Sequence, residues 1–334
     1  MTVKISIIGL GQIGGSIGLA LANHKDQVTT LGYDKSPEVT RKALKMAAVE
    51  KAGHSLFASV KEADVIILAL PLDQVYETLK SIAQDVREDG LVMDTTPVKQ
   101  TVEAWAKELL PPGRHYVGLT PALNPLVLDE TVTGIEAARP DLFQHGLMAV
   151  TAPHGTAGDA IKLAANFVAL LGAQAYFADL AEVDGIMATA HTLPALAAAA
   201  LAETVIGQPG WTDIRVLAGR PFVAATRPLE LEESPGLAEA ARQNRINTVR
   251  LLDEYIATLK SLRDEIDEVK GKSLQDRLER SARERAHWRR MRLEGDWRPD
   301  GIHDQNIPTL GDRLLQQIGL GRYLDQRNKK KKQE

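Results

Sequence analysis

The 334-residue chain contains no cysteine. This absence excludes disulfide bonds, thiolate zinc sites, iron–sulfur ligation and a cysteine nucleophile. Aromatic residues are sparse, at 4% of the chain, and the N-terminus carries no signal-peptide pattern. By inspection, no apolar run reaches the roughly 18–20 residues that a membrane-spanning helix needs. We therefore expect a cytoplasmic protein that does not enter a membrane.

The remaining composition is ordinary, with 44% hydrophobic and 25% charged residues, as in a globular protein. The length predicts two domains of roughly 100–200 residues each. Charge is uneven, because residues 272–334 carry 16 Lys and Arg against 10 Asp and Glu, a net +6, and the preceding residues carry −10. Acids alternate with bases along Leu274–Arg292, which favours a solvated helix over a nucleic-acid-binding arm.

The N-terminal half alternates short apolar strands with helical segments. The predicted strands are Val3–Gly9, Gln27–Asp34, Ala63–Leu70, Gly90–Asp94, His115–Gly118 and Gly146–Thr151. The helical patterns between them include Ile13–Asn23, Pro37–Ala48, Gln74–Asp85 and Val98–Leu109. Strands that are apolar throughout indicate a parallel sheet covered on both faces. The sequence thus predicts an α/β, Rossmann-type domain over residues 1–153.

The pattern changes after Pro153, where no strand is predicted. Helices are expected at Ala157–Leu171, Leu180–Ile206 and Asn244–Val269, and the second of these is apolar on nearly every side. We expect an all-helical domain over residues 154–270 that forms a homodimer; a monomeric bundle is the alternative. Residues 271–334 read as a charged helical extension that ends in a disordered lysine-rich segment.

A glycine-rich loop, Gly9-Leu10-Gly11-Gln12-Ile13-Gly14, separates the first strand from the first helix. The glycines at 9, 11 and 14 permit a tight turn, a close approach to a diphosphate and close helix–strand packing, respectively. Gln12 and Ile13 begin a helix whose N-terminus favours an anion. Asp34 ends the second strand and is placed to accept hydrogen bonds from the adenine ribose, so NAD is favoured over NADP.

Several further segments resemble the prephenate and arogenate dehydrogenase family. The stretch Gly9–Leu21 is similar to the family's opening, and the resemblance runs along most of residues 3–260. The other matching segments are Leu68–Pro71, Asp94–Lys99, Gly118–Pro121, His191–Pro194, Gly219–Phe222, Thr226-Arg227 and Asn244. The resemblance implies a dimeric helical domain, a nicotinamide cofactor and a pocket for that cofactor bordered by Pro71.

The family oxidises a cyclohexadienol with decarboxylation, on the way to tyrosine. Its histidine in G-x-H-P removes the hydroxyl proton, its serine in D-x-x-S-V-K supports that hydroxyl, and its T-R arginine binds a carboxylate. The resemblance implies that Arg227 binds a small carboxylated substrate, with Thr96 and Lys99 in the substrate-binding segment. The alternative for Arg227 is a surface ion pair.

Two family positions hold other residues here: Thr120 replaces the histidine and Pro97 the serine. A threonine hydroxyl has no pKa near neutrality and cannot act as a general base, a loss that typically costs about 10²–10⁴-fold in rate. The family's S-H-L-P histidine position holds Thr192, and His191 stands directly before it. We take Thr120 and His191 as candidate catalytic residues; a structural histidine is the alternative for His191.

These features predict a prephenate dehydrogenase-like oxidoreductase that uses NAD(P) and acts on prephenate or on another carboxylated cyclic alcohol. The alternative is a non-catalytic dinucleotide-binding protein whose tail engages a partner. A third interpretation, a sugar or β-hydroxy-acid dehydrogenase, requires a lysine such as Lys162 or Lys99 near the substrate. The spacing of His115, His145 and His154 makes no metal site, so we expect none.

Overall fold

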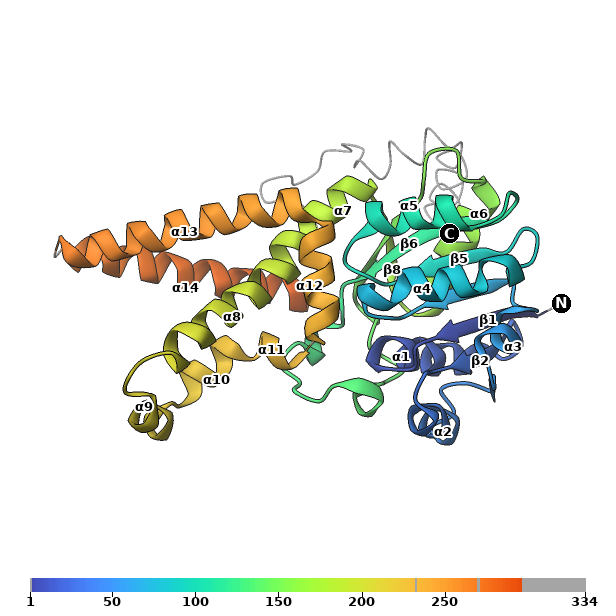
Figure 1. Cartoon of the computed structure of the whole chain (residues 1–334), viewed down its shortest axis with the longest axis horizontal. Coiled ribbons are helices and arrows are strands. Elements are labelled where there is room, and N and C mark those ends of the chain that lie inside the picture. Colours follow the sequence, from blue (N-terminus) through green and yellow to red (C-terminus); the bar gives the residue numbers. More distant parts are fainter. Residues whose placement is uncertain (1, 232, 269–270, 296–334) are drawn as a thin grey trace, which may run out of the picture. The chain divides into compact units, whose positions relative to one another are not determined.

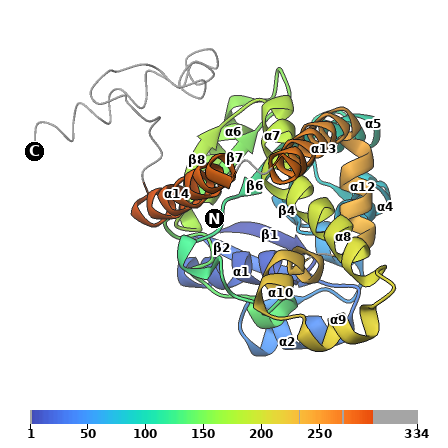
Figure 2. The ribbon, with the colours of Figure 1, turned by 90° about the vertical axis from the view of Figure 1, so that its left-hand side faces the viewer.

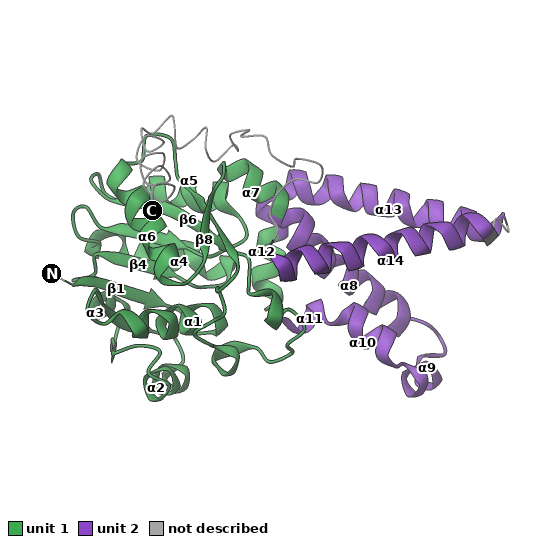
Figure 3. Ribbon diagram, turned by 180° about the vertical axis from the view of Figure 1, so that it is seen from behind, with its two compact units in different colours: residues 1–186, 233–240, 306–334 green, residues 187–232, 241–305 purple. Residues whose placement is uncertain are grey.

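The computed structural model describes residues 2–231, 233–268 and 271–295 (Figure 1). The described chain divides into two compact units (Figure 3). The first contains residues up to 186 together with 233–240, and the second contains 187–231, 241–268 and 271–295. The division therefore falls after residue 186 rather than after 153. The lysine-rich end predicted for the chain lies outside the described residues.

The first unit is built on one eight-stranded sheet with the order β3-β2-β1-β4-β5-β6-β7-β8. The strands are β1 Val3–Ile8, β2 Val28–Tyr33, β3 Lys51–Ala52, β4 Val65–Leu68, β5 Leu91–Asp94, β6 His115–Pro121, β7 Leu147–Thr151 and β8 Gln174–Phe177. Neighbouring strands are parallel except β6 and β7, which are antiparallel. The order of the first six strands is that of a dinucleotide-binding fold, so the predicted Rossmann-type sheet is confirmed.

Two strands were not expected from the sequence. β3 is only two residues long, and β8 lies in the half of the chain where no strand was predicted, so that prediction is wrong. Both lie at the edges of the sheet. The residues of β8 are exposed or half-buried, because an edge strand has one neighbour only. Such a strand lacks the apolar run that marks the central strands.

Helices cover both faces of this sheet. Side chains alternate along the central strands, so that Ile67 in β4 joins one apolar cluster and Ile66 joins the other. The first cluster includes residues of α1 (Gln12–Leu21) and α6 (Gly158–Leu170), and the second includes residues of α4 (Leu72–Ile82) and α5 (Lys99–Leu109). The other helices that begin in this unit are α2 Pro37–Lys45, α3 Leu56–Val60, α7 Leu180–Met187 and α12 Ser234–Gln243.

The second unit is helical in its described residues, as predicted. It contains a π-helical turn at Ala188–Thr192, then α8 Leu193–Ile206, α9 Trp211–Leu217, α10 Arg220–Thr226, α11 Pro228–Leu231, α13 Arg245–Asp267 and α14 Gly271–Glu294. The C-terminal part of α13 contacts the first turns of α14, and the two helices diverge from there (Figure 1 and Figure 2). Arg277 of α14 donates to Glu265 Oε1 at 2.7 Å and to Ser261 Oγ at 3.0 Å, which fixes the two helices to each other.

One helix contradicts the expectation that no apolar run is long enough to span a bilayer. The continuous helix Leu180–Ile206 has 27 residues and is long and apolar enough by length and composition to cross a membrane. A single helix of this kind is weak evidence for a membrane-spanning segment, because helices in the core of proteins that never enter a membrane can have the same length and composition. The helix contains Asp184, whose carboxylate is buried and hydrogen-bonded within the protein.

Candidate active site

The glycine-rich loop has the geometry that its sequence predicts. Gly9 follows β1 with φ of +89°, and a Cβ there would lie 2.3 Å from the backbone oxygen of Ala69. A Cβ on Gly14 would lie 1.9 Å from the oxygen of Gly9. Contacts this short are sterically forbidden, so only glycine fits at these two positions.

Gly11 differs from the other two glycines of the loop. It is the N-cap of α1, and a Cβ placed on it would meet nothing within 4 Å. No side chain caps this helix, and its first turn contains no acidic residue. The amide end of α1, which begins with Gln12 and Ile13, therefore keeps its partial positive charge beside open space. This arrangement fits the diphosphate group of a dinucleotide.

Asp34 is held beside this loop, directly after β2. Its Oδ2 accepts the backbone N–H of Leu10 at 2.9 Å, and its Oδ1 accepts that of Ser36 at 2.8 Å. The neighbouring Lys35 donates to Gln74 Oε1 at 3.2 Å. A carboxylate oxygen has lone pairs left after one such bond, so Asp34 remains able to accept ribose hydroxyls and to repel a 2′-phosphate.

Pro71 lies at the carboxyl end of the neighbouring strand. It is the N-cap residue of α4, three residues after β4 ends at Leu68. Gly236, in the first turn of α12, packs against it, since a Cβ on Gly236 would lie 2.9 Å from Pro71 Cβ. The sheet order puts this strand next to β1, at the crevice where open α/β sheets bind their ligands.

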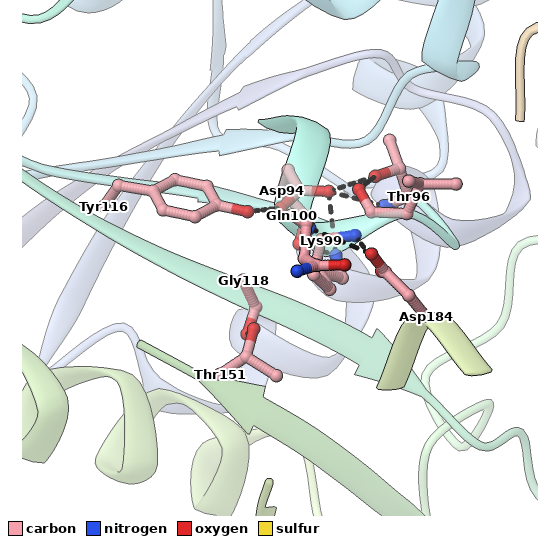
Figure 4. Close-up of polar contacts among 9 residues, drawn as sticks. Asp94, Thr96, Lys99, Gln100, Tyr116, Gly118, Thr151 and Asp184 are labelled. Atoms are coloured by element: carbon pink, nitrogen blue, oxygen red, sulfur yellow. Dashed lines mark hydrogen bonds and ion pairs between the residues drawn. The ribbon is translucent and has the colours of Figure 1, made fainter. Parts of the chain in front are cut away.

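A buried polar network occupies the carboxyl end of β5 (Figure 4). Asp94 Oδ2 accepts from Lys99 Nζ at 2.8 Å and from Thr96 at its backbone N–H (2.8 Å) and hydroxyl (2.5 Å). Asp94 Oδ1 accepts from the Tyr116 hydroxyl at 2.6 Å. Burial lowers the pKa of Lys99, against the attraction of Asp94, and raises the pKa of Tyr116 well above its ordinary value.

This network decides what Thr96 and Lys99 do in the structure. Both use their polar groups to bind Asp94, and the Lys99 side chain has no exposed surface. They therefore hold the segment that follows β5, and their predicted contact with a substrate stays a prediction. The third interpretation, a sugar or β-hydroxy-acid dehydrogenase, needs a lysine near the substrate and loses support. Lys99 is paired inside the protein, and Lys162 is an exposed residue whose Nζ lies 3.0 Å from Asp159 Oδ1.

Thr120 lies at the same edge of the sheet, near the end of β6. Asp94, the last residue of β5, pairs with Gly118 of β6. Thr120 is two residues further along β6 and therefore lies beyond the end of β5. The residue is 7% exposed, and its hydroxyl oxygen has no hydrogen-bond partner among the residues that the structure describes. Pro97 is half-buried in the segment between β5 and α5. Neither side chain provides a base.

The remaining predicted site residues, His191 and Arg227, belong to the second unit. His191 lies in the π-helical turn, three residues before Pro194, which cannot donate a backbone hydrogen bond to Ala190. Such turns often mark functional sites. Arg227 directly follows α10, and both side chains are half-buried.

Reasoning from the sequence missed one buried carboxylate near the end of β5. Asp184 in α7 accepts the backbone N–H groups of Lys99 and Gln100, which lie 85 and 84 residues earlier in the chain. The available signal was an acid at the centre of α7, a helix whose other residues are mostly apolar. Among the described residues no group of three or more metal-ligating side chains is placed to hold an ion.

Comparison with known proteins agrees with this geometry. Residues 17–177 match the family model described as "Prephenate dehydrogenase, nucleotide-binding domain". The chain is 28% identical over 304 residues to cyclohexadienyl dehydrogenase of Zymomonas mobilis, covering 90% of this chain and 100% of that protein. It is 26% identical over 279 residues to prephenate dehydrogenase of Bacillus subtilis, covering 82% and 73% of the two chains.

A solved structure shares the fold. Prephenate dehydrogenase from A. aeolicus, in complex with hydroxyphenyl propionate and NAD⁺, superimposes with a TM-score of 0.74 at 20% identity, covering 86% of this chain and 98% of that one. The sheet order, the glycine-rich loop and the sequence matches point to the same conclusion. Residues 17–177 match the nucleotide-binding domain of the prephenate dehydrogenase family, and over 82–90% of its length the chain is similar to dehydrogenases of that family.

Proposed function

We propose that this chain is an NAD-dependent dehydrogenase that acts on a small carboxylated cyclic alcohol of the prephenate or arogenate type. The observation that carries the proposal is the open, uncapped N-terminus of α1 at Gly11, beside the carboxylate of Asp34. These two features fit the diphosphate and the adenine ribose of NAD. The relatives named above are dehydrogenases of this kind, which supports a place in tyrosine biosynthesis.

The residues present constrain the chemistry. NAD, when bound, accepts a hydride from the carbon that carries the substrate hydroxyl. Arg227 pairs with a substrate carboxylate through its planar guanidinium. The Thr120 hydroxyl donates a hydrogen bond to a substrate oxygen and removes no proton, because it has no pKa near neutrality. His191 or a water molecule then takes the hydroxyl proton.

We also propose that the protein is a homodimer. Several large apolar side chains of the second unit are exposed in the single chain, which is the character of a face that a partner covers. They include Leu201, Ile206, Val216, Leu217, Val223, Ile246, Val249, Ile256 and Leu259. The oligomeric state is tested by sedimentation: a single species of one-chain mass would contradict this part of the proposal.

A non-catalytic dinucleotide-binding protein is the second candidate. Thr120 and Pro97 favour it, because the family's base and its hydroxyl-supporting serine are both absent from the segments that hold them. Such a protein would keep the cofactor site intact and lack a base near the nicotinamide. The two candidates therefore differ in turnover and agree in NAD binding.

A steady-state assay tests the proposal. Purified protein is mixed with NAD or NADP and with prephenate or arogenate, and formation of reduced nicotinamide is followed. The dehydrogenase gives a rate that falls in an Arg227→Ala variant and is unchanged in Arg220→Ala, which removes an exposed arginine from the same helical region. No rate with any of these pairs, together with NAD binding by calorimetry, would reject the activity and leave the non-catalytic candidate.

A Thr120→His variant distinguishes a chain that lacks only the general base from a chain that acts on a different substrate. Restoring the family's residue supplies a general base, which is typically worth about 10²–10⁴-fold. If the chain binds prephenate and lacks only the base, the variant gains activity toward prephenate. If the substrate differs, the variant gains nothing.

A further inference from the structure

The N-terminus of α5 is capped by a residue from a distant part of the chain. The N-cap residue of α5 is Val98, which offers no side-chain hydrogen bond. Asp184 supplies the cap: its Oδ1 accepts the Lys99 N–H at 2.5 Å, and its Oδ2 accepts the Gln100 N–H at 3.2 Å (Figure 4). Both carboxylate oxygens are therefore used to bind the first turn of one helix.

This cap is made inside the protein. Asp184 is 2% exposed, and a buried carboxylate is retained only where hydrogen bonds and nearby positive charge compensate for its lost hydration. Here burial raises the pKa of Asp184, and the nearby Asp94 carboxylate adds to that rise; the two N–H groups, the positive end of α5 and the Lys99 ammonium compensate for part of it. An interaction so enclosed fixes its partner more firmly than a cap in water.

The segment that this cap fixes runs from Thr95 to Val98, between β5 and α5. At its start, Asp94 binds the backbone N–H and the hydroxyl of Thr96, and the Thr95 N–H donates to the Leu68 oxygen at 3.2 Å. At its end, Asp184 binds the helix that follows. We call Thr95–Val98 the β5–α5 turn; it is held at each end by a buried carboxylate.

The position of the β5–α5 turn relative to a bound dinucleotide follows from the strand order. Asp34 follows β2 and takes the adenosine half, while the diphosphate lies at α1 between the two halves of the sheet. The nicotinamide half then falls on the other side of β1, over the carboxyl ends of β4 and β5. The β5–α5 turn begins at the end of β5.

We propose that Asp184 is a positioning residue for the nicotinamide ring: by capping α5 it holds the β5–α5 turn in the conformation that receives the ring. The inference rests on the proposed binding of NAD. Asp184 itself is enclosed in the protein. Its effect passes through the turn, and it is confined to the nicotinamide half of the cofactor.

Binding of NAD and of ADP-ribose, which lacks the nicotinamide, tests this inference. Both dissociation constants are measured by calorimetry for the wild type, Asp184→Ala and Asp184→Asn. Loss of an N-cap typically changes an equilibrium constant by about fivefold. We therefore expect Asp184→Ala to raise the dissociation constant of NAD by roughly fivefold and to leave that of ADP-ribose within about twofold. Asp184→Asn keeps one acceptor oxygen and should recover part of the loss.

The control is Asp159→Asn, which makes the same chemical change at an exposed carboxylate in the first turn of α6. A second readout is the emission of bound NADH, which reports on the surroundings of the nicotinamide; it should shift toward that of free NADH in the Asp184 variants only. Thermal melts of each variant show that it is folded, and Asp184→Asn serves if Asp184→Ala does not fold.

The outcomes separate the inference from the proposed function. Equal weakening of NAD and ADP-ribose, or unchanged binding with unchanged NADH emission, would show that Asp184 has a structural role only. Equal affinity of the wild type for both nucleotides would show that no turn receives the ring, and would also overturn the inference. Failure of the wild type to bind either nucleotide would overturn the proposed function itself.

Discussion

Lys99 Nζ lies 2.8 Å from Asp94 Oδ2, and neither side chain has any exposed surface. An ion pair that is enclosed in this way contributes little to the net stability of the folded protein, because both charges lose their hydration. Removing one partner has a much larger effect, since the other charge is then left without compensation. Asp94 also accepts from Thr96 and Tyr116, so its charge is part of the local structure.

Replacing Lys99 by methionine should therefore lower the free energy of unfolding by about 3–5 kcal/mol. Urea unfolding measures the change. Lys162→Met, which removes an exposed partner of Asp159, is the control and should alter stability by less than about 1 kcal/mol. The double variant Lys99→Met with Asp94→Asn should recover part of the loss, and no recovery would show that the charge left on Asp94 is not the cause.

Asp34 is expected to set the preference for NAD over NADP. An Asp34→Asn variant loses the charge that accepts the ribose hydroxyls and repels a 2′-phosphate, while keeping one oxygen for the Leu10 N–H. Hydrogen bonds to a charged group are worth about 1.5–3 kcal/mol, so NAD affinity should fall about 10- to 100-fold and NADP affinity should rise or stay constant. Calorimetry with both cofactors measures this, and the exposed Asp26→Asn is the control. A parallel loss of both affinities would contradict the assigned role.

The parts of the fold that could be predicted from the sequence are those that nearby residues determine. The φ of +89° at Gly9 and the close approach of Gly14 to the Gly9 oxygen are steric demands that arise within the loop itself, and the helix and strand around them have clear apolar patterns. Asp34 was identified because it ends a strand at the expected distance from the loop. A reader of the sequence can find such a site without knowing how distant segments pack.

The parts that were not predicted depend on contacts between distant residues. Asp184 caps α5 across 85 residues of sequence, and nothing near position 184 shows which amide groups it binds. Among the described strands β8 pairs with β7 alone, at the sheet edge, so burial did not select an apolar run there. Because β8 adds to the sheet, the first unit extends to residue 186 instead of ending near 153.

Acid should weaken the segment that follows β6. The Arg139 guanidinium donates to Asp141 at 2.5 and 2.9 Å and holds the pKa of that carboxyl below its ordinary value of 3.8. The unfolded chain then binds a proton more readily than the folded one, so this contribution is present above about pH 4 and is lost as the pH falls through the folded-state pKa. Melting temperatures of wild type and Asp141→Asn between pH 6 and about 2.5 should converge as the pH falls. Curves that stay parallel would contradict the ion pair.

The glycine-rich loop offers a matched pair of substitutions, Gly11→Ala and Gly14→Ala. A Cβ on Gly11 meets nothing within 4 Å, and the φ of −69° at that residue suits alanine, so stability should change by no more than about 0.5 kcal/mol. The new methyl group stands where the diphosphate must approach, and NAD affinity should fall by at least about tenfold, equivalent to 1.4 kcal/mol.

Gly14→Ala should, in contrast to Gly11→Ala, act mainly on the stability of the fold. Its Cβ would lie 1.9 Å from the Gly9 oxygen, a backbone atom that moves only with the turn itself, so the free energy of unfolding should fall by about 1–3 kcal/mol or more. Urea unfolding and calorimetry with NAD, applied to both variants, separate the two effects. If Gly11→Ala binds NAD as tightly as the wild type, the space beside the α1 N-terminus does not receive the diphosphate, and the cofactor site must lie elsewhere.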